Sequence, residues 1–187
     1  MKYLIACLGN IGKEYETTRH NIGFWVADQL CDDLGGSFTT GRLAQTTLLK
    51  YKGRSLVVIK PTTFMNLSGK AIQYWMQHEQ IPIERLLVVV DDIALPTALL
   101  RMKKKGGDAG HNGLNHIIQT LGTSEFARLR FGIGDDFPTG RQVDFVLGNW
   151  KPSELDLVKP KLSQAVEMIQ SFTTIGIERT MTMFNNK

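Results

Sequence analysis

Residues 3–8 form an almost uninterrupted apolar run, Tyr-Leu-Ile-Ala-Cys-Leu, which ends at a polar loop that contains two glycines. A strand with one solvated face alternates polar and apolar residues, so a continuous run predicts a strand that is buried on both faces of a sheet. Sheets with such strands are covered by helices on both sides. The loop at residues 9–21 is therefore expected at the carboxyl end of a central strand, where open α/β sheets bind their ligands.

The rest of the chain alternates further strands with helices. Strands are expected at residues 48–51, 55–59, 88–92 and 126–133, and helices at residues 21–34, 67–78, 153–172 and 177–184, with another helix after the glycine-rich loop at 106–115. The short separation Lys52-Gly53-Arg54 predicts a hairpin, so the sheet is mixed rather than wholly parallel. We expect an α/β fold over residues 1–187, a single-domain three-layer α/β/α structure with a mixed, mostly parallel twisted sheet.

The C-terminal helical segment carries its own start signal. Ser153-Glu154-Leu155-Asp156 is similar to a capping box, which predicts that the helix begins there. Pro160 falls within the first turns, where it leaves the continuity of the helix open. The positions that keep helical spacing further on are Leu162, Val166, Ile169 and Phe172.

Length and composition agree with a single globular domain. A chain of 187 residues can bury roughly 70% of its unfolded surface around one core. It has no linker, repeat or low-complexity tract, and no apolar run that approaches the ~20 residues of a membrane span. The N-terminus lacks the longer apolar core of a signal peptide, so a cytoplasmic protein with no membrane partner is expected. Cys7 and Cys31 are then expected to be reduced thiols.

Polar residues gather where the expected strands end and the helices begin. If the strands run parallel, these side chains converge on one rim of the sheet, an arrangement typical of an active site built on loops. The residues concerned are Asn10, His20, Asn66, Asp91, His111 and Asn112.

A dinucleotide-binding turn is the obvious alternative for a glycine-containing loop after a first strand. That turn needs Gly-x-Gly-x-x-Gly, and Cys7 places a side chain where its first glycine should stand. The following helix also begins only near Asn21, too late to direct its N-terminus at a phosphate. We therefore expect no nucleotide cofactor.

The order and spacing of the polar motifs resemble bacterial-type peptidyl-tRNA hydrolase, and the match extends from Met1 to about Trp150. The motifs are Leu8-Gly9-Asn10-Ile11-Gly12, Thr18-Arg19-His20-Asn21-Ile22-Gly23, the segment from Lys60 to Gly69, Asp91-Asp92, Gly110-His111-Asn112-Gly113-Leu114, and the segment from Phe126 to Gly134. Departures from the family pattern include Ile11 in place of proline, Ala94 in place of aspartate, and Asp108 in place of a small neutral residue. None of them removes a catalytic group that the resemblance implies.

The resemblance implies that His20 is the general base and that Asp91 holds and stabilises it. Imidazole suits this role, because its pKa near 6.5 allows it to take a proton from water at neutral pH. No motif places a nucleophilic serine or cysteine, so direct attack by water is expected. A zinc site is not expected, since His-Glu-x-x-His is absent and His111 and His116 are not an i,i+4 pair.

The resemblance also implies a set of substrate-binding residues: Asn10, Tyr15, Phe64, Asn66, His111 and Asn112. Among them, Asn66 resembles the residue that contacts the scissile carbonyl, and Asn10 the one that distinguishes N-blocked from free aminoacyl groups. Asn112 resembles a residue that orients the peptidyl end or a bridging water. Tyr15 and Phe64 match aromatic positions associated with the tRNA end, although packing beneath the loops is the alternative for Phe64.

Basic residues gather near the expected rim. The formal net charge is +4, which favours an anionic partner without requiring one. Arg101 and residues 103–105 precede the glycine-rich loop, and Arg128 and Arg130 lie on an expected strand. Such clusters are usually solvated surface, but next to an active-site rim they favour binding of phosphates. We expect Lys103 and Arg130 to contact tRNA phosphates.

The resemblance, together with these observations, predicts a monomeric hydrolase without a cofactor. It would cleave the ester between an N-blocked peptide and the 3′-terminal ribose of tRNA, releasing peptide and reusable tRNA. Its partner would be the acceptor end of peptidyl-tRNA, with the terminal adenosine. Two alternatives remain open, namely an RNA-binding protein of this fold without turnover and a nucleotide-binding oxidoreductase.

Overall fold

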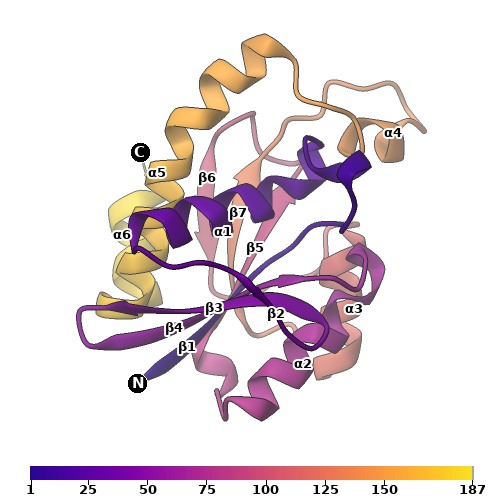
Figure 1. Cartoon of the computed structure of the whole chain (residues 1–187). Helices are drawn as coiled ribbons and strands as arrows, with labels where there is room; N and C mark the ends of the chain where they lie inside the picture. Colours follow the sequence, from indigo (N-terminus) through magenta and orange to yellow (C-terminus); the bar gives the residue numbers. More distant parts are fainter. Residues whose placement is uncertain (187) are drawn as a thin grey trace.

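The N-terminal apolar run forms the central strand of the sheet. The computed structural model describes residues 1–186, and its seven strands lie in the order β2-β3-β4-β1-β5-β7-β6 (Figure 1). Their bounds are β1 (Lys2–Cys7), β2 (Thr39–Thr40), β3 (Ala44–Tyr51), β4 (Arg54–Pro61), β5 (Leu86–Asp92), β6 (Leu100–Lys103) and β7 (Ala127–Gly132).

The middle of the sheet is parallel and its margins are antiparallel. Strand β1 pairs in parallel with β4 and β5, and β5 pairs in parallel with β7. The hairpin predicted around Lys52-Gly53-Arg54 is present as β3 and β4, and β2 and β6 add the remaining antiparallel pairs. The prediction of a mixed sheet is therefore confirmed.

Helices cover both faces of this sheet, as the three-layer prediction requires. One face carries α1 (Ile22–Asp33), α5 (Pro152–Ile175) and α6 (Ile177–Phe184), and the other carries α2 (Ser68–His78) and α3 (Asn112–Leu121). The short helix α4 (Gln142–Val146) belongs to neither layer and lies next to the loop that follows β1 (Figure 1).

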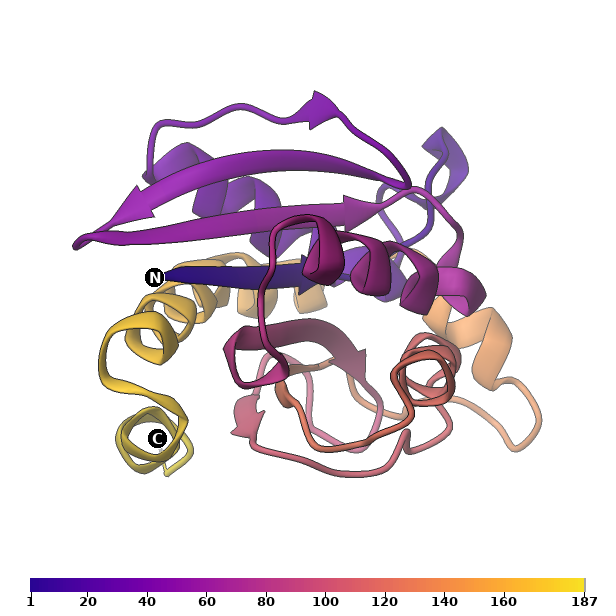
Figure 2. The ribbon, with the colours of Figure 1, turned by 90° about the horizontal axis from the view of Figure 1, so that it is seen from below.

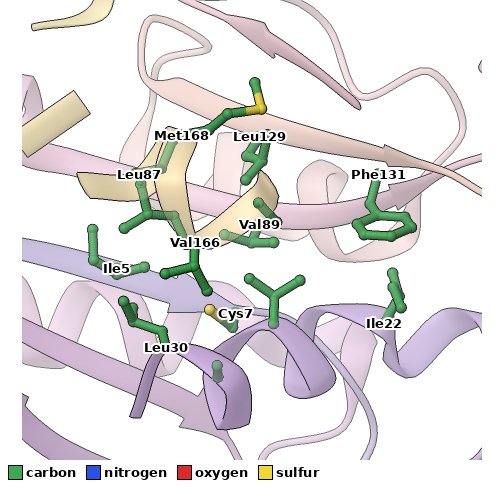
Figure 3. Close-up of a cluster of buried hydrophobic side chains, with 14 of the residues drawn as sticks. Ile5, Cys7, Ile22, Leu30, Leu87, Val89, Leu129, Phe131, Val166 and Met168 are labelled. Carbon is green, nitrogen blue, oxygen red and sulfur yellow. The ribbon is translucent and has the colours of Figure 1, made fainter. Parts of the chain in front are cut away.

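Alternate side chains of β1 enter two separate cores. Ile5 and Cys7 pack with α1 and α5, and Figure 3 shows them facing Leu30 of α1 and Val166 of α5. Leu4 and the other β1 side chains that point to the opposite face of the sheet pack with α2 and α3. This two-sided burial explains why the run at residues 3–8 has no polar position.

The C-terminal helices differ in one detail from the sequence prediction. Helix α5 begins at Pro152, and its N-cap is Lys151 rather than Ser153. The capping carboxylate belongs to Glu154, which accepts a hydrogen bond from the Lys151 backbone N–H at 2.7 Å. Pro160 lies inside the helix without ending it.

The last helix completes the edge of the sheet. Figure 2 shows the chain ending beside the sheet, and Asn185 there hydrogen-bonds both backbone groups of Met102 in β6 at 2.8 Å. An edge strand exposes unpaired backbone groups, and this contact satisfies the N–H and the C=O of one residue of β6, Met102. Within residues 1–186, none of the helices combines the length and apolarity that crossing a membrane would need.

Gly23 fixes the distance between α1 and the sheet. A Cβ atom added there would lie 2.4 Å from the Leu8 carbonyl oxygen and 2.7 Å from the Leu8 nitrogen, both backbone atoms. We expect Gly23→Ala to lower the free energy of unfolding by about 2–3 kcal/mol, since the backbone must move to relieve the overlap. Gly107→Ala is the control, because an added Cβ there meets nothing within 4 Å. Urea unfolding of both variants tests this, and equal stabilities would contradict it.

Candidate active site

The predicted rim is present at the carboxyl ends of β1 and β5. Two adjoining pockets lie there, and His20, Asn112, Val143 and Val146 line both of them. The first is also lined by Asp91 and His111, and the second by Asn10 and Asn66, so the structure brings all six rim residues together: Asn10, His20, Asn66, Asp91, His111 and Asn112.

A buried carboxylate joins two histidines at the centre of the site. Asp91 is the penultimate residue of β5, and its Oδ2 lies 2.8 Å from His20 Nδ1 while its Oδ1 lies 2.9 Å from His111 Nε2. The Asp91 side chain is only 2% exposed and both imidazoles are 9% exposed. A charge buried to this extent must be compensated, and here both carboxylate oxygens receive a ring N–H.

The backbone of α3 determines which nitrogen of His111 carries the proton. His111 is the N-cap of this helix, and its Nδ1 accepts hydrogen bonds from the N–H groups of Gly113 and Leu114 at 3.1 and 3.2 Å. A nitrogen that accepts N–H bonds holds a lone pair, so the ring proton must be on Nε2, which donates to Asp91.

The same reasoning extends to His20. With Asp91 accepting at Oδ2, the His20 Nδ1 carries a proton and Nε2 holds the lone pair. Burial lowers the pKa of His20, whereas the charge and hydrogen bond of Asp91 raise it, and the net result is a pKa above 6.5. Burial raises the pKa of Asp91, but the two histidines hold it well below its usual range. The site thus contains an ionised carboxylate beside an imidazole that can accept a proton.

Asn21 and Met65 hold Asn10 in place. The Asn21 side chain bonds both backbone groups of Asn10, at 2.8 Å to the N–H and 2.9 Å to the carbonyl. The Asn10 Oδ1 accepts from the Met65 backbone N–H at 2.7 Å, which leaves the Nδ2 group as the donor for a ligand. Sequence reasoning did not assign Asn21 a role, although its position beside His20 in the same motif was a signal for one.

Asn66 and Phe64 lie on the turn that follows β4. The Asn66 side chain is exposed and lines the second pocket. The Phe64 backbone has φ 58°, a conformation that costs a non-glycine residue energy and that presents the Met65 N–H to Asn10. Phe64 is half exposed and meets the ring of Tyr15 edge-on at 6.4 Å between centroids. Neither aromatic ring lines the two pockets that His20 lines.

Asp108 braces the loop that leads to His111. Its two carboxylate oxygens accept from the Gly110 N–H at 2.9 Å and from the Asn115 amide at 2.7 Å. These bonds, led by the one from Asn115, lower the pKa of Asp108. The acidic side chain that departs from the family pattern therefore bonds within its own loop.

Helix α4 forms the outer wall of both pockets and was missed from the sequence. Val143 and Val146 face both pockets, with Gln142 at one and Leu147 at the other. Apolar residues at positions 143, 146 and 147 were the available signal for one face of a helix. The segment was too short for this periodicity to be recognised.

The two residues predicted to contact phosphates differ in their surroundings. Lys103 is exposed, and no carboxylate of residues 1–186 lies within ion-pair distance of it. Arg130 Nε lies 2.6 Å from Asp92 Oδ2, so its charge is shared with the residue next to Asp91. Arg128 is buried and donates to the carbonyls of Gly107 and Ser124, which makes it a structural residue.

The His20, Asp91 and His111 side chains also offer three possible metal-ligand atoms within 4.8 Å of one another. A metal on His111 Nε2 would require a proton on Nδ1, and that nitrogen faces the N–H groups of Gly113 and Leu114. The donor set therefore does not fit a metal in this arrangement.

The fold and the site together define an α/β protein with a buried carboxylate–imidazole pair that opens onto a loop-built cleft. Such a pair can remove a proton from a water molecule in that cleft.

Comparisons with known proteins identify the family. The family model described as "Peptidyl-tRNA hydrolase" matches residues 4–187. Peptidyl-tRNA hydrolases from Parabacteroides distasonis and Cytophaga hutchinsonii are 57% and 52% identical over 187 residues, with 100% of each chain covered. The crystal structure of peptidyl-tRNA hydrolase from Acinetobacter baumannii has a TM-score of 0.93 at 31% identity, covering 98% of this chain and 94% of that one.

The chain belongs to the peptidyl-tRNA hydrolase family, so the resemblance drawn from the motifs is confirmed. The family consists of hydrolases that take part in translation. The alternative of a nucleotide-binding oxidoreductase is therefore wrong.

Proposed function

We propose that this protein hydrolyses the ester between an N-blocked peptide and the 3′-terminal ribose of tRNA, with His20 as the general base. The observation that carries the proposal is the His20–Asp91 pair, whose geometry leaves the His20 Nε2 lone pair without a hydrogen bond to residues 1–186. The family to which the chain belongs acts on the same substrate, peptidyl-tRNA. The enzyme acts in the cytoplasm as a monomer.

The reaction starts with a water molecule at His20 Nε2. As the water oxygen attacks the ester carbonyl, Nε2 takes one of its protons and the carbonyl oxygen becomes negatively charged. The tetrahedral intermediate then collapses, the bond to the ribose 3′ oxygen breaks, and His20 gives its proton to that oxygen. Asp91 stabilises the imidazolium between the two steps. His111 donates its Nε2–H to the other carboxylate oxygen and so helps to keep Asp91 ionised.

Asparagine amides stabilise the charge that develops on the substrate. Asn66 is exposed at the cleft and donates to the carbonyl oxygen, while the Asn10 Nδ2 group donates to the peptide beside the ester. Asn112 begins α3 and orients the peptidyl end or a water. Neutral donors serve here because a cation at the same place would lower the pKa of His20.

The tRNA lies toward the β6–β7 edge of the sheet. Lys103 pairs with Arg128 and Arg101 with Arg130 across the two strands, so these four basic residues share one face. Lys103 and Arg130 contact phosphates there, and the terminal adenosine stacks near Tyr15 and Phe64.

His20→Ala tests the general base. We expect the rate of hydrolysis of N-acetyl-aminoacyl-tRNA to fall by on the order of 10²–10⁴-fold, with tRNA binding largely retained, because proton abstraction is lost and phosphate contacts are not. His78→Ala is the matched control, since His78 stacks on Tyr74 away from the cleft. Near-normal turnover by a folded His20→Ala protein would remove the base assignment. It would also reopen the alternative of an RNA-binding protein without turnover.

Asp91→Asn tests how the proton on His20 is placed. An asparagine has one acceptor oxygen. That oxygen accepts from His111 Nε2–H, because α3 fixes the tautomer of His111. The amide NH₂ then faces His20 Nδ1 and leaves the proton on Nε2, so the rate should fall by on the order of 10²–10⁴-fold. The pKa of His20 should also fall, since burial remains without the carboxylate, and the acid limb of the pH profile of kcat/KM should move to lower pH.

The double variant Asp91→Asn/His111→Ala frees the asparagine oxygen for His20. We expect it to be faster than Asp91→Asn alone by roughly tenfold, because the productive tautomer is restored. A double variant slower than Asp91→Asn would contradict the tautomer argument.

Lys103→Ala tests the phosphate contacts. We expect a higher KM for peptidyl-tRNA and a log–log salt dependence that is flatter by about one unit, with little change for a minimal peptidyl ester. Lys104→Ala is the control, because Lys104 is exposed but paired with Glu178 at 2.9 Å. An equal loss on both substrates would mean that Lys103 supports the fold instead. Arg130→Ala, measured in parallel, should show a smaller change in slope, since Asp92 already shares the charge of Arg130.

A further inference from the structure

Helix α4 needs an anchor. It has five residues, none of which is buried, yet it forms the outer wall of both pockets. An isolated helix of this length is not stable in water, because too few hydrogen bonds offset the cost of its nucleation. Its position over the cleft must therefore come from contacts with other elements.

Arg19, the residue directly before His20, supplies those contacts. Its side chain is 6% exposed, and Nη1 donates to the Phe145 carbonyl in the last turn of α4 at 3.0 Å. The guanidinium carbon also lies 4.1 Å from the centre of the Phe145 ring. A cation at the C-terminal end of a helix and over an aromatic face is stabilised by both groups.

Further bonds join the same arginine to the chain that follows α4. Nη2 lies 2.7 Å from Glu154 Oε1, the carboxylate that caps α5, and the Arg19 backbone N–H donates to the Gly148 carbonyl at 3.0 Å. A Cβ atom at Gly148 would lie 2.9 Å from Arg19 Nη1, so a glycine keeps room for the guanidinium. Arg19 thus connects the turn of the base, the end of α4 and the start of α5.

We propose that Arg19 is a positioning residue that holds α4 against the cleft, so that the turn carrying the base also sets the cleft's outer wall. The effect on catalysis rests on the proposed function, whereas the effect on α4 does not. Arg19 itself touches no reacting atom, and its loss should loosen substrate binding rather than the proton transfer.

Limited trypsin digestion tests the position of α4 without any assay of activity. The measured quantity is the rate of cleavage of the bond after Arg141, which is exposed at the start of α4. In Arg19→Gln we expect cleavage there to be about tenfold faster, because local opening exposes the segment to the protease. Arg54→Gln is the matched control, since Arg54 likewise bonds a helix-end carbonyl, that of Thr174 in α5, far from the cleft.

The double variant Arg19→Gln/Glu154→Gln separates positioning from a buried unpaired charge. Removing both charges should recover thermal stability while cleavage after Arg141 stays fast, because the bond to Phe145 is still missing. If cleavage returns to the parent rate in the double variant, or is unchanged in Arg19→Gln, the proposal is overturned.

Kinetic measurements distinguish a residue that positions the wall of the cleft from a residue that takes part in catalysis. With N-acetyl-aminoacyl-tRNA, Arg19→Gln should raise KM by about tenfold and change kcat by less than about threefold. The acid limb of the pH profile should stay in place because His20 and Asp91 are unaltered. A loss confined to kcat would assign Arg19 to the base instead and overturn the proposal. A parent enzyme without turnover would refute the proposed function, and the trypsin comparison would still decide the role of Arg19.

Discussion

The arrangement of the site depends on one buried carboxylate that is shared by two imidazoles. Asp91 can remain ionised at 2% side-chain exposure only because a ring N–H reaches each of its oxygens. One of the two donors is fixed by the backbone, since the first N–H groups of α3 occupy His111 Nδ1. The start of a helix thereby determines where the proton lies on a histidine in another loop, and so which nitrogen of His20 can act as a base.

The parallel pairing of β1 and β5 makes this arrangement possible. His20 and Asp91 are 71 positions apart in the chain, but they follow or end neighbouring strands that run in the same direction. The Leu8 N–H continues that pairing by donating to Val89, which carries the register into the loop. Two-sided burial of residues 3–8, visible in the sequence, thus predicted both the central strand and the place of the site.

The sequence was informative where a local pattern has one structural meaning. Apolar runs predicted the central strands, and polar residues at their ends predicted the rim. It failed where the outcome depends on partners from distant segments. The pairing of Arg130 with Asp92 follows from the register of β7 on β5, which no local pattern encodes. Two other failures were local. The capping pattern of Ser153 with Asp156 predicted the start of α5, whereas Glu154 accepts from the Lys151 N–H, and α4 has too few residues for its periodicity to be recognised.

Charged side chains on the loops and strands next to His20, the proposed base, are paired within the protein. Arg19 is neutralised by Glu154 at 2.7 Å, Lys60 by Asp28 at 2.6 Å, and Asp92 by Arg130 at 2.6 Å. The second pocket beside His20 is lined only by neutral amides and apolar side chains. An unpaired cation there would lower the pKa of His20, so this separation preserves the basicity that the proposed role of His20 requires. The exposed Lys103, the proposed phosphate contact, lies instead on the β6–β7 face and lines neither pocket beside His20, so the proposed phosphate binding is kept apart from the proposed proton transfer.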